Sequence, residues 1–340
     1  MMTPATASAK TQNTKAKTKD KTGPIFSRTP GLTDAITNYC PGCTHGIVQR
    51  LVAEAIEELD AQGRAVGVCP VGCSVLAYEF YSCDMVQAAH GRAPAVATGL
   101  KRARPENVIF TYQGDGDLAS IGMAETVHAA TRGENITVIF INNAIYGMTG
   151  GQMAPTSLPG QVTQTSPYGR DVETAGYPIR VCEMLSSLDG VALAQRVTVD
   201  SPRTVRAAKK AIKKAFEYQT EGLGYTIIEV VATCPTNWGF TPADAFTWLR
   251  DNLLPYYPLG VYRDIKAESK DDKAADTVAD KLAAAKAAKA EASTGSTEAG
   301  STAPEAPEVA PETAAETDSE VAPETAPEVA PETTSEKGGE

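Results

Sequence analysis

The stretch from residue 107 to 152 constrains the fold more than any other part of the chain. Two apolar runs, 108–112 and 136–141, end in the sequences GDG (114–116) and NN (142–143), and a helix-like segment separates them. A strand, a glycine turn carrying a carboxylate, a helix and a second strand make one βαβ unit. The pattern therefore predicts an α/β fold with a mostly parallel sheet and helices on both faces.

The two strand ends also predict a ligand site. Ligands of open α/β sheets bind at the carboxyl ends of the strands, so Asp115 and Asn143 should meet at one edge. Their oxygens suit Mg²⁺, and Gly114 and Gly116 let backbone amides approach a diphosphate. A GDG sequence alone is more often a surface turn, but the spaced NN pair favours a metal–diphosphate site.

The ends of the chain differ in composition from its middle. Residues 1–24 are rich in Thr, Lys and Ala and predict a disordered leader without the apolar core of a signal peptide. Residues 263–292 predict a charged Ala/Lys-rich linker with helical potential, and 293–340 a disordered acidic tail rich in Pro, Glu and Ala. The net charge of -11 comes largely from that tail and indicates no acidic active site.

The segment 25–262 remains as one α/β domain. It contains no run near the ~20 apolar residues of a membrane helix. We expect a soluble cytoplasmic protein whose partners include neither a membrane nor nucleic acid.

The first chemical motif is the pair Cys40 and Cys43, a CxxC before an amphipathic helix. Such a pair can be a thioredoxin-type dithiol, half of a zinc site or half of an iron–sulfur site. A redox dithiol should follow a first strand, and the sequence before Tyr39 predicts none.

The remaining cysteines decide between these readings. The chain has seven cysteines, an odd number, and no secretory signal, which argues against a disulfide framework. The sequence of a zinc site typically shows a second CxxC or paired histidines. Here Cys69 and Cys73 have CxxxC spacing, and the histidines are scattered. Four thiolates from distant turns are compatible with a [4Fe–4S] cluster.

Two further segments carry candidate ligands. In His90-Gly91-Arg92, the histidine can donate to a phosphate or a developing oxyanion, and Arg92 can bind a carboxylate or phosphate. An isolated histidine is more often structural, so this assignment depends on the neighbouring diphosphate site. The glycine-rich segment 144–152 could wrap a diphosphate with its amides and the Thr149 hydroxyl.

Near the end of the domain, 225–231 predicts a strand that delivers Cys234 to the same sheet edge as Asp115. The helix predicted after Ser201 carries four lysines on its outer side. That basic face could meet an acidic partner protein, but a solvated face is favoured. The lysines are Lys209, Lys210, Lys213 and Lys214.

Taken in order, five segments resemble the β subunit of 2-oxoacid:ferredoxin oxidoreductases of the 2-oxoglutarate or 2-oxoisovalerate type. They are YCPGCTHG, PVGCS, AAHGRAPAVATGLKR, GDGD…NNAIYGMTGGQ and ATCPTNWGF. The likeness covers about residues 30–262 and implies a fold that binds thiamine diphosphate (ThDP). It also implies Mg²⁺ bound by Asp115, Asn143 and the backbone carbonyl of Ile145.

The resemblance further implies one [4Fe–4S] cluster. Its ligands would be Cys40, Cys43, Cys73 and Cys234. Cys69 competes for the third place, and the matching Gly72-Cys73-Ser74 turn favours Cys73. Residues expected to contact the cofactor are Gly72, Ser74, His90, Gly91, Arg92, Gly114, Asp115, Gly116, Asp117, Asn143, Ile145, Gly147, Met148 and Thr149. His90 is also the candidate catalytic residue.

The family's reaction is the ThDP-dependent oxidative decarboxylation of a 2-oxoacid to an acyl-CoA and CO₂, with electrons passing through the cluster to ferredoxin. The glutamate that contacts the pyrimidine ring comes from an α subunit in this family, so the chain alone should be inactive; γ and δ subunits are further candidate partners. Some relatives carry a lysine where this chain has Gly150. Its absence weakens 2-oxoglutarate as the substrate and leaves room for branched-chain 2-oxoacids.

Two alternatives stand beside this interpretation. A non-redox ThDP decarboxylase or carboligase subunit would use the GDG and NN sequences but leave the cysteines unexplained. A zinc-stabilised interaction module without catalysis would explain some cysteines but not the GDG and NN spacing.

Overall fold

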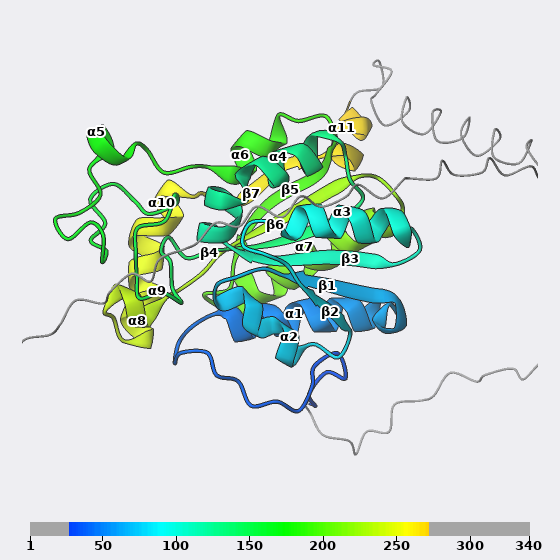
Figure 1. Ribbon diagram of the computed structural model, residues 1–340, viewed down its shortest axis with the longest axis horizontal. Coiled ribbons are helices and arrows are strands. Elements are labelled where there is room, and N and C mark those ends of the chain that lie inside the picture. Colours follow the sequence, from blue (N-terminus) through cyan, green and yellow to red (C-terminus); the bar gives the residue numbers. More distant parts are fainter. Residues whose placement is uncertain (1–26, 272–340) are drawn as a thin grey trace, which may run out of the picture. The chain divides into compact units, whose positions relative to one another are not determined.

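A computed structural model of the chain describes residues 27–271. Its core is a seven-stranded sheet in the order β2-β1-β3-β4-β6-β5-β7 (Figure 1). Every neighbouring pair is parallel except β5 with β7. The strands are β1 (Ala65–Cys69), β2 (Asp84–Gln87), β3 (Val108–Gly114), β4 (Thr137–Asn142), β5 (Val191–Thr198), β6 (Tyr225–Val231) and β7 (Gly260–Asp264).

Helices cover both faces of this sheet, as predicted (Figure 1). The helices are α1 (His45–Glu58), α2 (Ala77–Phe80), α3 (Ala93–Ala103), α4 (Met123–Thr131), α5 (Val172–Ala175), α6 (Val181–Ser186), α7 (Pro202–Thr220), α8 (Pro235–Trp238), α9 (Pro242–Trp248), α10 (Leu254–Tyr256) and α11 (Ile265–Asp271). Single 3₁₀ turns occupy Gln62–Arg64 and Cys73–Leu76, and π turns occupy Asp117–Ile121 and Leu249–Leu253.

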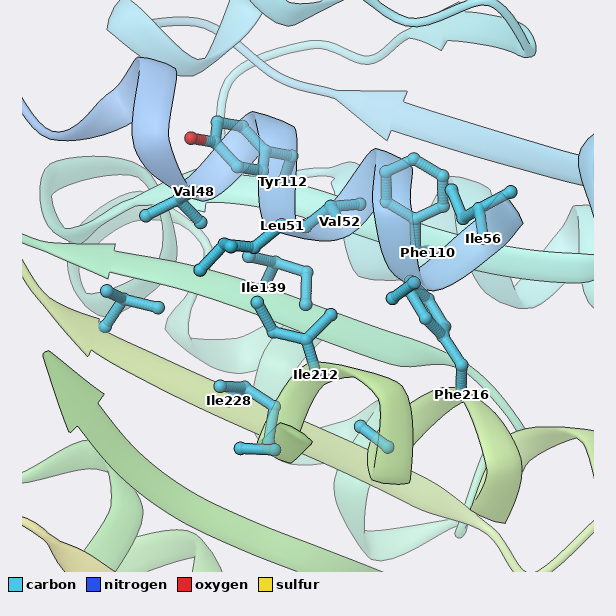
Figure 2. Packing of buried hydrophobic residues seen from close by; sticks show 14 of the residues in the cluster. Val48, Leu51, Val52, Ile56, Phe110, Tyr112, Ile139, Ile212, Phe216 and Ile228 are labelled. Carbon is cyan, nitrogen blue, oxygen red and sulfur yellow. The ribbon is translucent and has the colours of Figure 1, made fainter. Parts of the chain in front are cut away.

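The sheet is buried on both sides, which explains why 138–141 of β4 is an unbroken apolar run; β6 is equally buried but carries Thr226 and Glu229 within it. Figure 2 shows one face, where Leu51 of α1 and Ile212 of α7 pack on Ile139 of β4. Helices α3, α4 and α6 cover the other face, where Ile109 and Phe140 are buried. Each such aliphatic or aromatic side chain contributes about 1.5–3 kcal/mol by leaving water.

Helix α7 begins where the sequence predicts. The Ser201 hydroxyl accepts a hydrogen bond from the Thr204 amide, and Pro202 occupies the first turn. Three of the four lysines of this helix are paired with acidic side chains rather than forming an open basic face. Lys209 bonds Glu54 and Glu58 of α1, and Lys213 also bonds Glu58, so these charges tie α7 to α1.

The edges of the domain differ from the prediction. The sequence predicts only the end of strand β5 (Val191–Thr198), as a short run at 197–199, because the first half of the strand alternates alanine with larger apolar residues and carries no clear strand signal. Strand β7 and helix α11 continue past residue 262, the predicted end of the domain. The predicted leader at 1–24, the tail at 293–340 and most of the linker at 263–292 lie outside the described residues. Within residues 27–271, every helix is too short or too polar to traverse a bilayer.

Candidate cofactor site

The predicted site lies at the carboxyl ends of β3 and β4, where Gly114 pairs with Ile141. A single pocket opens there. Its lining is His45, Val71, Gly72, Cys73, Ser74, His90, Gly114, Asp115, Gly116, Asp117, Asn143, Ile145, Tyr146, Gly147, Met148 and Thr149. The structure thus brings together all the predicted cofactor residues except Gly91 and Arg92.

Asp115 is the buried carboxylate of the pocket. One oxygen accepts from the Gly116 amide at 2.8 Å, and the other accepts from the Thr156 hydroxyl at 2.7 Å and the Ile145 amide at 3.3 Å. Burial raises the pKa of Asp115 to about 6, although these hydrogen bonds oppose the rise. A carboxylate held in a fixed place and costly to ionise is well suited to a bound cation.

Asn143 supplies the second oxygen. Its side-chain Oδ1 is buried without a hydrogen-bond partner, while its backbone carbonyl accepts from the Trp238 indole at 3.2 Å. A buried oxygen without a partner costs stability. Two hard oxygens, one charged and one without a partner, fit the Mg²⁺ that the GDG and NN sequences predict.

The turn after Asn143 is strained. Ala144 has a φ of 58°, in the left-handed region that an alanine rarely adopts. Its carbonyl accepts from the Ser157 hydroxyl at 2.6 Å and the Gln161 amide at 2.9 Å. Contacts from the 153–170 loop therefore hold this turn in place.

The two glycines of the GDG sequence serve different purposes. A Cβ atom on Gly116 would lie 2.1 Å from the Tyr146 ring, whose hydroxyl donates to the Gly116 carbonyl. A Cβ atom on Gly114 would meet nothing within 4 Å. Gly116 therefore admits Tyr146, while Gly114 keeps the pocket open for a ligand.

His90 pairs with Asp117 across the pocket wall. Asp117 is buried, and its carboxylate also accepts from the Gly91 amide and the Gln113 side chain. Burial raises the pKa of Asp117, against these hydrogen bonds. Since Nδ1 of His90 is engaged, Nε2 is the ring nitrogen left for the pocket.

Arg92 has other partners than those predicted. Its guanidinium bonds the Glu125 carboxylate of α4 at 2.5 Å and the Ile121 carbonyl, and it does not line the pocket. The basic side chain suggested that Arg92 binds a phosphate, but it forms an ion pair with Glu125 of the next helix instead. Gly91 contributes only its amide, which bonds Asp117.

The four predicted cluster cysteines gather beside this pocket. A Cβ atom on Gly147 would lie 3.3 Å from Cys73 Sγ and 3.5 Å from Cys234 Sγ, so both sulfurs reach one point. Burial, together with the neighbouring Cys234, Cys73 and Cys40, raises the pKa of Cys43 to about 12. Burial likewise raises the pKa of Cys73 to about 11, with Cys234, Cys40 and Asp115 adding to the rise.

All seven cysteines are free. Among residues 27–271, no group of three or more His, Cys, Asp or Glu side chains stands in an arrangement that could hold a metal ion. The four thiols are therefore neighbours without forming a closed ligand set. Their soft sulfur chemistry still fits an iron–sulfur cluster.

The competing cysteine lies elsewhere. Cys69 is buried at the end of β1. Burial raises the pKa of its thiol, and the neighbouring Cys83 thiol adds to the rise. Cys182 is a buried residue of α6, beside Glu229. Neither of them lines the pocket.

Several residues of the site carry no signal in the sequence. The Thr156 hydroxyl reaches Asp115 from an irregular loop, and the Asn237 amide donates to Cys234 Sγ at 3.3 Å. Tyr39 donates to the Cys73 carbonyl and stacks on His45, whose pKa burial lowers to about 4. Only the fold brings these side chains to the site.

Comparison with known proteins agrees with this geometry. The family model "Thiamine pyrophosphate enzyme, C-terminal TPP binding domain" matches residues 70–230. Ketoisovalerate oxidoreductase subunit VorA of Methanothermobacter thermautotrophicus is 49% identical over 246 residues, which is 72% of this chain and 52% of that protein. The chain thus spans about half the length of that relative.

A second relative matches over most of its length. The 2-oxoglutarate synthase subunit KorB of Methanocaldococcus jannaschii is 38% identical over 222 residues, which is 64% of this chain and 78% of that protein. Among solved structures, a 2-oxoglutarate:ferredoxin oxidoreductase from Magnetococcus marinus, with 2-oxoglutarate, coenzyme A and succinyl-CoA bound, aligns with a TM-score of 0.59. The two sequences are 25% identical, and the alignment covers 80% of this chain and 91% of the Magnetococcus chain.

These matches favour the predicted family over the zinc-module and non-redox alternatives, since this chain matches a thiamine pyrophosphate binding domain and a relative from Aeropyrum pernix is named a 2-oxoacid:ferredoxin oxidoreductase subunit. The family predicted from the five segments is confirmed. The chain belongs to the β subunits of 2-oxoacid:ferredoxin oxidoreductases, whose fold binds thiamine diphosphate.

Proposed function

We propose that this chain is the cofactor-bearing β subunit of an enzyme that oxidatively decarboxylates a 2-oxoacid to an acyl-CoA and CO₂, reducing ferredoxin. One observation carries the proposal: the pocket that holds Asp115 and Asn143 is also lined by the thiol-bearing Cys73. A metal–diphosphate site and a cluster ligand share one wall. Electrons could therefore pass from the cofactor to a cluster bound by Cys73 over a short distance.

Within the pocket, Asp115, the orphaned Asn143 Oδ1 and the Ile145 carbonyl would hold Mg²⁺. The amides around Gly114, Gly116 and the 145–149 loop would cradle the diphosphate. Bound ThDP supplies an electron sink for the carbanion left by decarboxylation. His90 faces the same space through Nε2, which would accept a hydrogen bond from substrate or cofactor while the ring is neutral and donate one when the ring is protonated.

The four thiols Cys40, Cys43, Cys73 and Cys234 would ligate one [4Fe–4S] cluster. Burial raises the pKa of Cys43, Cys73 and Cys234, so cluster assembly has to release their protons. Asn237 donates to Sγ of the proposed ligand Cys234, and such a hydrogen bond would tune the reduction potential of the cluster.

The substrate we propose is a branched-chain 2-oxoacid, with 2-oxoglutarate as the second candidate. The apolar side chains of Val71, Ile145 and Met148 line the pocket, and position 150 is a glycine that offers no cation to a second carboxylate. The more similar of the two relatives described above is named a ketoisovalerate oxidoreductase subunit.

The partners we propose are an α subunit that brings the pyrimidine glutamate, coenzyme A as co-substrate and ferredoxin as acceptor, with γ and δ subunits as further candidates. The relatives are named as subunits of larger enzymes. Free thiols that must bind iron suit a reducing compartment, which is the cytoplasm.

The test is anaerobic co-expression with the partner subunits. We expect a brown complex, bleached by dithionite, with about four irons per β chain. Its activity should be highest with 2-oxoisovalerate, lower with 2-oxoglutarate and lowest with pyruvate, each assayed with coenzyme A and ferredoxin. A colourless complex with stoichiometric zinc would overturn the cluster, and a preference for 2-oxoglutarate would overturn the substrate assignment.

A further inference from the structure

A buried charge network lies in the sheet directly behind the metal-binding turn. Glu229 of β6 and Arg196 of β5 have fully buried side chains, and Arg196 Nε lies 2.9 Å from Glu229 Oε2. Buried charges are costly even when paired, so a pair in the middle of a sheet calls for an explanation beyond stability.

The other oxygen of Glu229 points to the turn. Glu229 Oε1 accepts from Asn142 Nδ2 at 2.8 Å, and Asn142 Oδ1 accepts from the Ala144 amide at 3.3 Å. A carboxylate only accepts hydrogen bonds, so it forces the NH₂ end of Asn142 toward itself. The Asn142 oxygen is then turned toward Ala144, and Asn142 acts as a clip between the two.

That clip closes the strained turn that carries Asn143. Ser157 and Gln161 bind the Ala144 carbonyl from the loop side, whereas Asn142 binds its amide from the sheet side. A left-handed alanine persists only where its surroundings impose it. The position of the orphaned Asn143 oxygen thus depends on a residue of the neighbouring strand.

We infer that Glu229 is a positioning residue for the divalent metal, acting through Asn142 to hold the turn that presents Asn143. The inference rests on the proposed Mg²⁺–ThDP site. Arg196 lets a charged residue occupy that position, since its guanidinium neutralises Glu229 inside the sheet. Arg196 is itself anchored by the Glu183 carboxylate and the Tyr262 hydroxyl.

This arrangement predicts what the isosteric Glu229→Gln variant does. Arg196 presents only donors, so the new amide must turn its oxygen toward Arg196 and its NH₂ toward Asn142. The Asn142 amide must then rotate to accept, which sets its NH₂ against the Ala144 amide. The clip is lost although the side chain keeps its size.

A matched control is available on the same arginine. Glu183 bonds Arg196 with both oxygens, at 2.9 and 2.6 Å, but bonds neither Asn142 nor the turn. Glu183→Gln therefore disturbs the charge network without touching the clip. Asn142→Ala removes the clip while leaving the Arg196–Glu229 pair intact. It is the second test variant, to be used if the Glu229 variant does not fold.

The experiment titrates Mn²⁺ into the metal-depleted complex with ThDP present and follows the free-ion EPR signal. Loss of an outer partner of a metal ligand costs about 10–100-fold in affinity. We expect at least a tenfold loss in Glu229→Gln and Asn142→Ala and a change within about twofold in Glu183→Gln. The melting temperature of each complex is recorded alongside.

Two results would overturn the inference: wild-type affinity in Glu229→Gln and Asn142→Ala, or an equal loss in Glu183→Gln, which would indicate a general effect of stability. A wild-type complex that binds neither Mn²⁺ nor ThDP would instead refute the proposed function, and this inference with it.

Discussion

His90 Nδ1 lies 2.5 Å from Asp117 Oδ1, and Asp117 is buried while His90 reaches the pocket. A carboxylate at Nδ1 fixes the proton of the neutral imidazole on that nitrogen and leaves Nε2 as an acceptor; protonation of the ring turns Nε2 into a donor. The sequence places the two residues in separate motifs, and the fold couples them.

Replacing Asp117 by alanine should therefore change the tautomer of His90. We expect the proton to move to Nε2 and kcat of the complex to fall about 100-fold. The chain has three histidines, so ¹⁵N NMR of the ring nitrogens, assigned with His90→Gln, reads the tautomer directly. A lower melting temperature with an unchanged tautomer would show that Asp117 is only structural.

The two glycines of the GDG sequence should respond differently to alanine. In Gly114→Ala the new Cβ meets no protein atom within 4 Å, so stability should stay at the wild-type value while ThDP affinity falls at least about tenfold. In Gly116→Ala the Cβ overlaps Tyr146 and unfolding should be easier by about 1–3 kcal/mol. Calorimetry of ThDP binding and thermal unfolding separate the two outcomes. Unchanged ThDP affinity in Gly114→Ala would contradict the proposal that the backbone around Gly114 binds the diphosphate.

The central strands were predictable because they are buried on both faces, so that burial appears in the sequence as an apolar run, as in 138–141 of β4. Strand β2 was not, since its residues are partly exposed and it pairs only with β1. Strand β7 depends on antiparallel pairing with β5, some seventy residues earlier, which no local pattern encodes.

The same distinction holds in the site. Asp115 and Asn143 were predictable because each directly follows a strand, and strand order then brings them together. Thr156 bonds Asp115 from 41 residues away in an irregular loop, and nothing in its neighbourhood indicates that contact. For Arg92, residue type suggested an anion ligand, but Glu125 supplies the anion from within the protein.

The choice of Cys73 and Cys234 as cluster ligands over Cys69 can be tested directly. Cys234→Ser should lower the iron content of the anaerobic complex and alter the EPR spectrum after dithionite reduction, since the thiol stands beside Cys73 and Gly147. Cys69→Ala is the control. It should cost about 1 kcal/mol of stability from the buried sulfur and keep four irons per β chain, to within assay error. Normal iron and an unchanged spectrum in Cys234→Ser would exclude it as a ligand.

Asp264 marks where the folded domain continues past residue 262. Its carboxylate accepts from Lys214, from the Tyr218 hydroxyl at 2.6 Å and from the first amides of α11. Burial alone would raise the pKa of Asp264, but these partners outweigh it and lower the pKa.

An acid whose folded pKa is lowered adds stability above its unfolded pKa of about 3.9 and loses it as pH falls through the folded value. Asp264→Asn should therefore lower the free energy of unfolding by about 1 kcal/mol at pH 7. The difference from wild type should shrink below about pH 4 and disappear once the pH is below the lowered folded pKa, where the wild-type carboxyl is neutral too. Denaturant unfolding at the two pH values checks this. A difference that does not depend on pH would mean that Asp264 acts through packing rather than charge, and that Lys214 contributes nothing as its partner.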